Sequence, residues 1–362
     1  MAFDRRVTIK QVAKEAGVSP QTVSRVVNNH PDVSTDTRER VQQVINRLAY
    51  SPSLVARTLL NGRSRTLGVV GSGLELFGPS HTLVGIEKQA ESMGYALHLT
   101  LVQQPEKSDA TLLRRLLSYQ VDGVIWAVPE IGDNRSWVKP EVAHFVVPMV
   151  FLSMRPDPAL SVVAVDNREG GRLATAHLIS QGCRKIGLIT GPRRQWEAHQ
   201  RRLGWETALR AAGLEPTEEW VVEGDWTPAS GEQGLLKLVE QRPDVEAVFV
   251  CNDQMAVGAL QAARHLGRRI PADLAIVGFD DVPECAYFHP PLSTIRQDMV
   301  EVGSCAVREL CRVIEASQQS KTLIQPRTIL IQPQLIVRQS SGVQSAPDNR
   351  GMVAPVGKKE TR

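Results

Sequence analysis

From Thr66 onward, short apolar runs alternate with longer amphipathic stretches, and this alternation constrains the fold more than any other feature of the sequence. Apolar runs of strand length occur at residues 66–71, 95–101, 121–128, 148–152, 161–165, 185–190, 220–223, 246–250 and 273–278. Helical patterns fill the intervals at 80–93, 107–119, 167–181, 196–212, 229–242, 252–267 and 299–316. Strands separated by helices of this length form parallel sheets with crossover helices.

So many strand–helix units exceed one standard doubly wound sheet, so we expect an α/β core of two lobes over residues 63–340, with the break between lobes near 161–166. A hydrophobic content of 42% and a charged content of 22% are ordinary for a globular chain. The polar residues 341–362 lack periodicity and are expected to form a disordered tail. This tail contains no Leu or Ile, hence no heptad seam, which favours a dimer over a tetramer.

The first fifty residues follow a different, all-helical pattern. Apolar residues recur at helical spacing over 8–16, Ser19 can cap a second helix with Pro20 at its first position, and Ser34 opens a third. Residues 1–62 carry nine Lys and Arg against five acidic side chains, although the whole chain has a net charge of only +3. Three short helices with a basic bias predict a helix-turn-helix head over 1–52 that binds double-stranded DNA. A three-helix bundle for protein contacts is the alternative.

A helix-turn-helix places the start of its second helix against base edges in the major groove. Gln21 can pair with adenine and Arg25 with guanine, whereas Thr22 and Ser24 are suited to phosphate. Tyr50-Ser51-Pro52 ends the third helix, and residues 53–62 are too few to form a stable helix alone in water. We therefore expect a hinge segment that becomes ordered only when something packs against it.

The head resembles the LacI/GalR family of regulators in Val7-Thr-Ile-Lys-Gln-Val-Ala-Lys-Glu-Ala-Gly-Val-Ser-Pro-Gln-Thr-Val-Ser-Arg-Val-Val-Asn29. The resemblance extends to about Arg338 through Asn252-Asp-Gln-Met-Ala-Val-Gly258 and Val277-Gly-Phe-Asp-Asp281, among other motifs. It implies that 53–62 is a hinge helix and that Leu59 wedges into a minor-groove step. The DNA contacts it implies are Thr8, Ser19, Pro20, Gln21, Thr22, Ser24, Arg25, Asn28 and Leu59. Pro20 departs from the family pattern and offers only apolar contact, so the operator should differ at that base.

Polar residues follow several of the expected strands in the core. Trp226 comes after 220–223, Asn252 and Asp253 after 246–250, and Asp280 after 273–278. Ligands of open α/β sheets bind at the carboxyl ends of strands, and sugars are bound by bidentate polar groups and an aromatic face. Each residue also has a structural alternative: Asp253 could cap a helix, Trp226 could be core, and Arg201 could be a surface charge.

The family resemblance implies a sugar site in this core. Arg201, Trp226, Asn252 and Asp280 match sugar-binding positions, and Gln254, Gln297, Leu76 and Pro79 match other pocket positions. Ser153 stands where an acid is expected, Gln104 where an arginine is expected, and Glu197 where a small hydroxyl residue is expected. A galactoside is the leading expectation because the Gly224-Asp-Trp226 motif is kept; another glycoside or a disaccharide is the alternative.

These features together predict a cytoplasmic, homodimeric repressor that a sugar effector releases from its operator. No catalytic residue, cofactor, metal or membrane partner is expected: Gly68–Gly73 is not a G-x-G-x-x-G motif, and the five cysteines form no C-x-x-C pair. A transporter's solute-binding protein would need an export signal, which the N-terminus lacks, and would not use the head. An activator, or a repressor that needs a corepressor, remains open.

Overall fold

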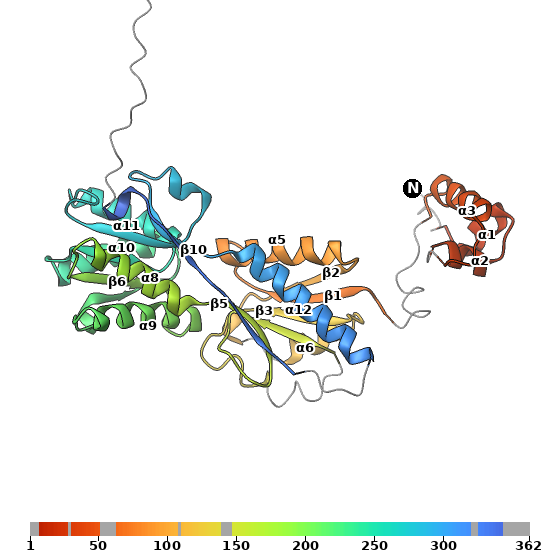
Figure 1. The fold of residues 1–362 in the computed structure, drawn as a ribbon, viewed down its shortest axis with the longest axis horizontal. Coiled ribbons are helices and arrows are strands. Elements are labelled where there is room, and N and C mark those ends of the chain that lie inside the picture. The colour runs from red at the N-terminus through yellow and green to blue at the C-terminus, as the bar shows by residue number, and fades with distance from the viewer. Residues whose placement is uncertain are drawn as a thin grey trace, which may run out of the picture. The chain divides into compact units, whose positions relative to one another are not determined.

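The computed structural model describes residues 7–27, 30–50, 63–107, 110–138, 147–319 and 325–342. The chain divides into two compact units, Met1–Arg65 and Thr66–Arg362, which are described separately. Figure 1 shows the helices of the first unit in red and the lobes of the second from orange to blue.

The first unit is the small helical head that the sequence predicts, with helices α1 (Ile9–Ala16), α2 (Pro20–Val27) and α3 (Thr35–Arg47). A capping box begins α1, in which Thr8 accepts from the backbone N–H of Gln11 and the Gln11 side chain accepts from that of Thr8. Gly17 ends α1 with a φ of 64°, a conformation that glycine adopts without strain. The three helices bury one apolar cluster made of Val12, Ala13, Ala16, Val23, Val26, Val41 and Val44.

The second unit holds two six-stranded sheets, which confirms the two-lobed α/β prediction. The sheet of the first lobe has the order β11-β5-β4-β3-β1-β2, and all its pairs are parallel. Its strands are β1 (Thr66–Gly71), β2 (Ala96–Leu101), β3 (Gly123–Ala127), β4 (Met149–Leu152), β5 (Ser161–Val165) and β11 (Thr328–Ile331). Helices α5 (Phe77–Ser92) and α12 (Met299–Gln319) share one apolar cluster with this sheet, and α6 (Ala110–Leu117) belongs to another.

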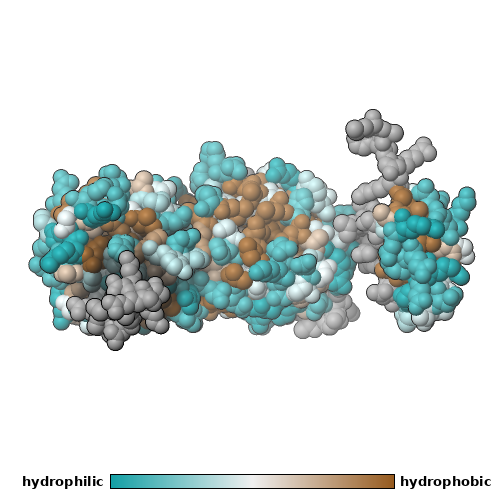
Figure 2. Space-filling model, turned by 90° about the horizontal axis from the view of Figure 1, so that it is seen from above, coloured by the Kyte–Doolittle hydropathy of each residue, from teal (hydrophilic) through white to brown (hydrophobic). Residues whose placement is uncertain are grey.

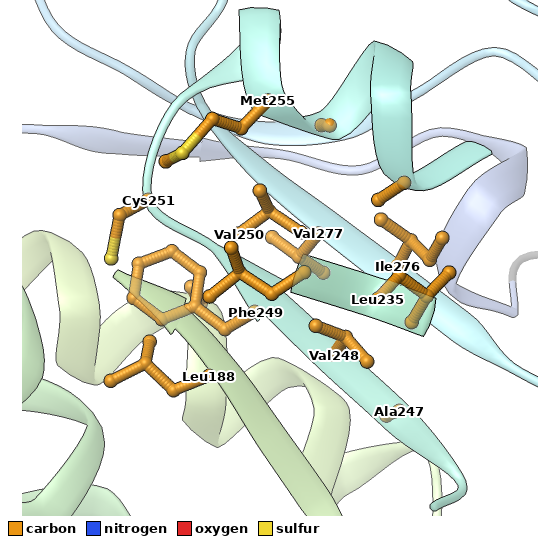
Figure 3. Packing of buried hydrophobic residues seen from close by; sticks show 14 of the residues in the cluster. Leu188, Leu235, Ala247, Val248, Phe249, Val250, Cys251, Met255, Ile276 and Val277 are labelled. Carbon is orange, nitrogen blue, oxygen red and sulfur yellow. The ribbon is translucent and has the colours of Figure 1, made fainter. Parts of the chain in front are cut away.

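The sheet of the second lobe has the order β12-β10-β9-β8-β6-β7, with only β12 antiparallel to its neighbour. Its strands are β6 (Ile186–Thr190), β7 (Val221–Glu223), β8 (Ala247–Val250), β9 (Ala275–Asp280), β10 (Ser293–Arg296) and β12 (Gln334–Ile336). Its helices are α8 (Asn167–Ser180), α9 (Trp196–Ala211), α10 (Pro228–Gln241) and α11 (Asp253–His265). Phe249 and its neighbours on the central strand β8 are fully buried in one apolar cluster (Figure 3).

The chain passes between the two lobes three times. The first passage follows β5, where the sequence placed the break, and the others connect β10 to α12 and β11 to β12. Figure 1 shows the blue strand that joins the two lobes. The sequence missed β10, β11 and β12 because the short strands β10 and β12 include polar residues, and β11 and β12 are partly exposed strands at the sheet edges.

In each lobe, two helices cross so closely at a glycine that their backbones are in contact. A Cβ on Gly204 of α9 would lie 2.1 Å from the carbonyl oxygen of Arg168 on α8. A Cβ on Gly303 of α12 would lie 2.1 Å from the carbonyl oxygen of Thr82 on α5. A side chain at either glycine would therefore force the backbones apart, and α9 carries pocket residues that would move with it.

Ser341, the first residue of the expected tail, is part of the folded core. Ser341 is fully buried in the 3-10 helix Gln339–Ser341, with its hydroxyl 2.7 Å from Nε2 of His177 and donating to the hydroxyl of Ser293 at 2.6 Å. These hydrogen bonds connect the residues after β12 to α8 and β10. The local sequence is polar and gave no indication of this long-range contact.

Candidate effector pocket and nucleic-acid interface

The start of α2 exposes the side chains expected to read DNA. Pro20, Gln21 and Arg25 are exposed to solvent. The hydroxyl of Ser19 accepts from the backbone N–H of Thr22 at 3.1 Å and lies 2.9 Å from the Thr22 hydroxyl. Ser19 therefore caps α2. The exposed side chains of Gln21 and Arg25 are long enough to reach base edges.

The other expected DNA contacts divide into two groups. The hydroxyl of Thr8 is bonded within the capping box of α1, and Ser24 is half-buried on α2. Asn28, Leu59 and the hinge segment 53–62 lie outside the described residues.

A cavity of about 460 Å³ lies between the two lobes of the core. All eight residues predicted as pocket positions line it: Leu76, Pro79, Arg201, Trp226, Asn252, Gln254, Asp280 and Gln297. Leu76 and Pro79 come from the start of α5 in the first lobe, whereas the polar members other than Gln297 come from the second lobe. Gln297 lies in the passage from β10 to α12. Ser153 and Glu197 also line the cavity, whereas Gln104 is exposed and is not among the lining residues, although its neighbours Gln103 and Pro105 are.

Arg201 is buried on α9, which rejects the surface-charge alternative. Its Nε donates to Oδ1 of Asn167 at 2.7 Å, and its Nη1 donates to the carbonyl of Cys251. The guanidinium carbon lies 3.7 Å from the centre of the Phe279 ring, and Nη1 is 3.9 Å from Oδ1 of Asp280. The guanidinium is thus fixed in place before any ligand arrives.

Asn252 positions the loop that carries Trp226. Its Oδ1 accepts from the backbone N–H of Met255 at 2.9 Å, which caps α11, and its Nδ2 donates to the carbonyl of Trp226 at 3.0 Å. Trp226 has a φ of 75°, an uncommon value for a non-glycine residue, and its Nε1 donates to Oε1 of Gln195 at 2.8 Å. A Cβ on Gly191 would lie 2.1 Å from the indole, so only glycine leaves room for this ring orientation.

Asp280 is a buried carboxyl at the end of β9 that accepts from Nε2 of Gln297. Burial raises the pKa of Asp280 to about 8, an effect that Arg201 opposes and the nearby carboxylates of Asp253 and Glu197 reinforce. The raised pKa favours the protonated form of this carboxyl group at neutral pH. It can then donate or accept a hydrogen bond toward a ligand.

Asp253 and Asp281, which the sequence also placed after strands, have structural roles. Asp253 is fully buried and accepts from Thr294 Oγ1 at 2.7 Å and from the backbone N–H of Val282 at 3.0 Å. The capping alternative for Asp253 is wrong, because Asn252 is the cap. Asp281 accepts from Arg296 and Arg338 at 2.6 and 2.7 Å.

Sequence reasoning missed Asn167, Gly191 and Gln195, which orient Arg201 and Trp226. No local pattern could reveal them, since each acts on a side chain 30 or more residues away. Within the described part of the chain, no group of His, Cys, Asp and Glu side chains is arranged to hold a metal ion. In the same residues, no helix has both the length and the apolar character needed to cross a bilayer.

A helix-turn-helix head joined to a two-lobed core with a polar cavity between its lobes defines a ligand-responsive DNA-binding regulator. Residues 8–53 match the family model "Bacterial regulatory proteins, lacI family", and residues 175–341 match "Periplasmic binding protein-like domain". The chain belongs to the LacI family, and it is a DNA-binding transcriptional repressor.

Two known repressors illustrate what this chain is similar to over most of its length. The transcriptional repressor PurR of Haemophilus influenzae (strain PittEE) is 34% identical over 92% of this chain and 98% of the relative. The lactose operon repressor of Escherichia coli (strain K12) is 34% identical over 85% of this chain and 84% of the relative. These relatives are transcriptional regulators rather than enzymes.

Two solved structures extend the comparison to three dimensions. The lac repressor dimer bound to operator and the anti-inducer ONPF has a TM-score of 0.83 and 32% identity, covering 93% of this chain and 99% of that chain. A complex of the transcriptional regulator CelR with cellobiose has a TM-score of 0.67 and 32% identity, covering 92% and 100%.

Proposed function

We propose that this repressor is a homodimer released from its operator when a saccharide occupies the cavity, with a galactoside as the first candidate. The observation that carries the proposal is the meeting of all eight expected pocket residues around one cavity between the lobes. Its volume of about 460 Å³ falls within the range typical of small-molecule sites.

The chemistry of the lining supports a sugar. Trp226 offers an aromatic surface for the C–H face of a ring, while the guanidinium of Arg201 and the carboxyl group of Asp280 offer polar partners for adjacent hydroxyls. Leu76 and Pro79 supply an apolar wall from the other lobe. The similar regulator CelR forms a complex with cellobiose, so a disaccharide is the second candidate.

An exposed apolar patch on the first lobe supports the dimer. Val84 on α5, together with Leu99 and Leu101 on the edge strand β2, is 40–45% exposed. Figure 2 shows the resulting hydrophobic surface on the lobe that contains these elements. Exposed apolar patches mark interaction sites, and the similar lac repressor structure is that of a dimer. Two heads would then read the two halves of a near-palindromic operator.

The experiment that tests the proposal is a gel shift on the DNA upstream of the chain's own gene, titrated with galactosides, glucosides and disaccharides. We expect at least one saccharide to release the DNA, and the same DNA to weaken binding of that saccharide reciprocally. If a sugar tightened operator binding instead, the chain would be a repressor that needs a corepressor. If no sugar changed operator affinity, the proposed effector class would be wrong.

Arg25→Ala tests the DNA interface of the head. The exposed guanidinium is expected to contribute about 1–3 kcal/mol through a base contact, so the variant should lose that affinity and discriminate less at one base pair. Fluorescence anisotropy with the operator and its single-base variants measures both effects. A uniform loss on all sequences would show that Arg25 contacts phosphate instead.

A further inference from the structure

Acidic side chains outnumber basic ones around the effector cavity. The described residues that line it include four acids, Glu75, Glu197, Asp225 and Asp280, and one base, Arg201. Glu75 and Asp225 are exposed, and the Asp225 carboxylate accepts from Thr227. The two carboxyls that face the interior are therefore Glu197 on α9 and Asp280 at the end of β9.

Of these two carboxyl groups, the guanidinium of Arg201 lies within ion-pair distance only of Asp280. Arg201 is held by Asn167 and by the carbonyl of Cys251, stacks on Phe279, and approaches Asp280 to 3.9 Å. Among the described residues, no Lys or Arg side chain lies within ion-pair distance, 4.0 Å, of Glu197.

Glu197 is held across the cleft by the first lobe. Its carboxyl is hydrogen-bonded to Ser153, which follows β4, and burial raises its pKa against the opposing effects of Arg201 and Ser153. The backbone brings these residues together, since the N–H of Trp196 donates to the carbonyl of Glu130 at 3.0 Å and the N–H of Glu130 donates to that of Ser153 at 3.0 Å. A desolvated carboxylate needs either a proton or a cation. A protonated amine of a ligand would supply such a cation.

We propose that the effector is an amino sugar or its glycoside, and that Glu197 determines this specificity by binding the protonated amine of the ligand. The proposal rests on the proposed function of this cavity as a saccharide site. The ring hydroxyls would then lie toward Arg201 and Asp280. A further acceptor is Oε1 of Gln254, a lining residue whose buried oxygen has no hydrogen-bond partner in the protein.

The same arrangement disfavours anionic sugars. A uronate or a sugar phosphate would bring a negative charge beside the carboxylate of Glu197, and the single guanidinium in the lining, that of Arg201, is held by Asn167 and the Cys251 carbonyl. In a water-poor cavity such like-charge contacts are poorly screened. We therefore expect the affinity to be highest for an amino sugar, lower for the neutral sugar and lowest for the acidic sugar.

Isothermal titration calorimetry of the full-length chain at pH 7 tests this order with matched ligands. The probes are galactose, galactosamine and galacturonate, with the three corresponding glucose derivatives. We expect the amine of the favoured series to bind about tenfold or more tightly than its neutral counterpart, as a charge-assisted hydrogen bond predicts. The uronate should not bind measurably.

Substitutions of Glu197 test whether this side chain is responsible for the preference for an amino sugar. Glu197→Gln should bind amine and neutral sugar within about threefold of each other, and Glu197→Ser should do the same if the amide substitution disturbs folding. Glu215→Gln removes an exposed acid of the same lobe outside the cavity and should retain the wild-type preference. Operator binding without sugar reports that each variant is folded.

The outcomes separate this inference from the proposed function. If a neutral sugar binds as tightly as its amine and releases the operator, the amine proposal is overturned and the saccharide-responsive repressor stands. An amine preference that survives in both Glu197 variants overturns the role of Glu197. If no saccharide of any charge binds, the proposed effector class fails, and the amine proposal fails with it.

Discussion

The two lobes contribute opposite chemistry to the same cavity. The second lobe supplies Arg201, Trp226, Asn252 and Asp280, all buried and tied to one another or to nearby backbone. The first lobe supplies mainly apolar surface, including Leu76 and Pro79 at the start of α5. Side chains fixed by their own hydrogen bonds recognise a ligand at little entropic cost, whereas apolar walls mainly exclude water.

If the cavity binds the proposed effector, the second lobe would recognise it and the first lobe would enclose it. The backbones of the two lobes are in direct contact. The N–H of Gly132 in the first lobe donates to the carbonyl of Arg194 in the second at 2.9 Å, and Ile131 pairs with Gln195 as an isolated antiparallel bridge. Gln195 also accepts from the indole of Trp226. A ligand that contacts Trp226 would therefore act on a residue at the seam between the lobes.

Arg201→Ala should produce the largest loss of effector affinity. Removing the buried guanidinium leaves its hydrogen-bond partners Asn167 and the Cys251 carbonyl unsatisfied, which costs about 2–5 kcal/mol, or roughly 30-fold or more in Kd. Calorimetry with a saccharide that releases the operator in the gel shift measures the loss, and operator binding without saccharide serves as the control. A loss of affinity of less than about threefold would show that Arg201 does not recognise the effector, which contradicts the assignment of recognition to the second lobe.

Trp226→Ala should have the next largest effect, about 1–2 kcal/mol or roughly tenfold in Kd, because it removes the aromatic face. Trp220→Ala is the matched control: this half-buried tryptophan of the same lobe stacks on Arg242 at 3.9 Å and is outside the cavity lining. We expect wild-type effector affinity in the control. Equal losses in the two variants would mean that tryptophan removal destabilises the lobe in general.

The buried acids of the second lobe should make its stability fall as pH rises. Below about pH 4, Asp280 is protonated in both the folded and the unfolded chain; between about 4 and 8 only the folded chain retains the proton, so ionisation favours unfolding. The slope is at most about 1.4 kcal/mol per pH unit for this proton. Asp280→Asn should flatten the decline, while Asp244→Asn, an exposed acid whose pKa Arg242 lowers, should not.

Urea unfolding followed by tryptophan fluorescence measures that slope in the core alone, because all six tryptophans lie between residues 126 and 226. A free energy of unfolding that increased steadily from pH 5 to pH 8 would show that Asp280 is ionised in the folded chain. The pocket would then hold a charged pair with Arg201 even when empty.

The sequence predicted the repeated strand–helix units because parallel strands and their crossover helices leave a strong local pattern of apolar residues. It also placed Trp226, Asn252 and Asp280 at strand ends, where topology brings them together. It could not reveal β10 and β12, which are short and partly polar, or β11, which is partly exposed at a sheet edge, because such strands depend on their neighbours more than on their own composition. Long-range orienting contacts, such as that of Asn167 with Arg201, are equally invisible to local patterns.

Leu76→Ala in the first lobe should have the smallest effect of the series. Leu76 lines the cavity and packs against the apolar cluster of the second lobe, so its truncation removes part of a wall and part of the seam. The apolar area lost corresponds to about 1 kcal/mol, or roughly fivefold in Kd. Since no hydrogen bond to the ligand is lost, the preference among sugars measured by calorimetry should be unchanged. A variant that altered this preference would show that the first lobe recognises the effector as well as enclosing it.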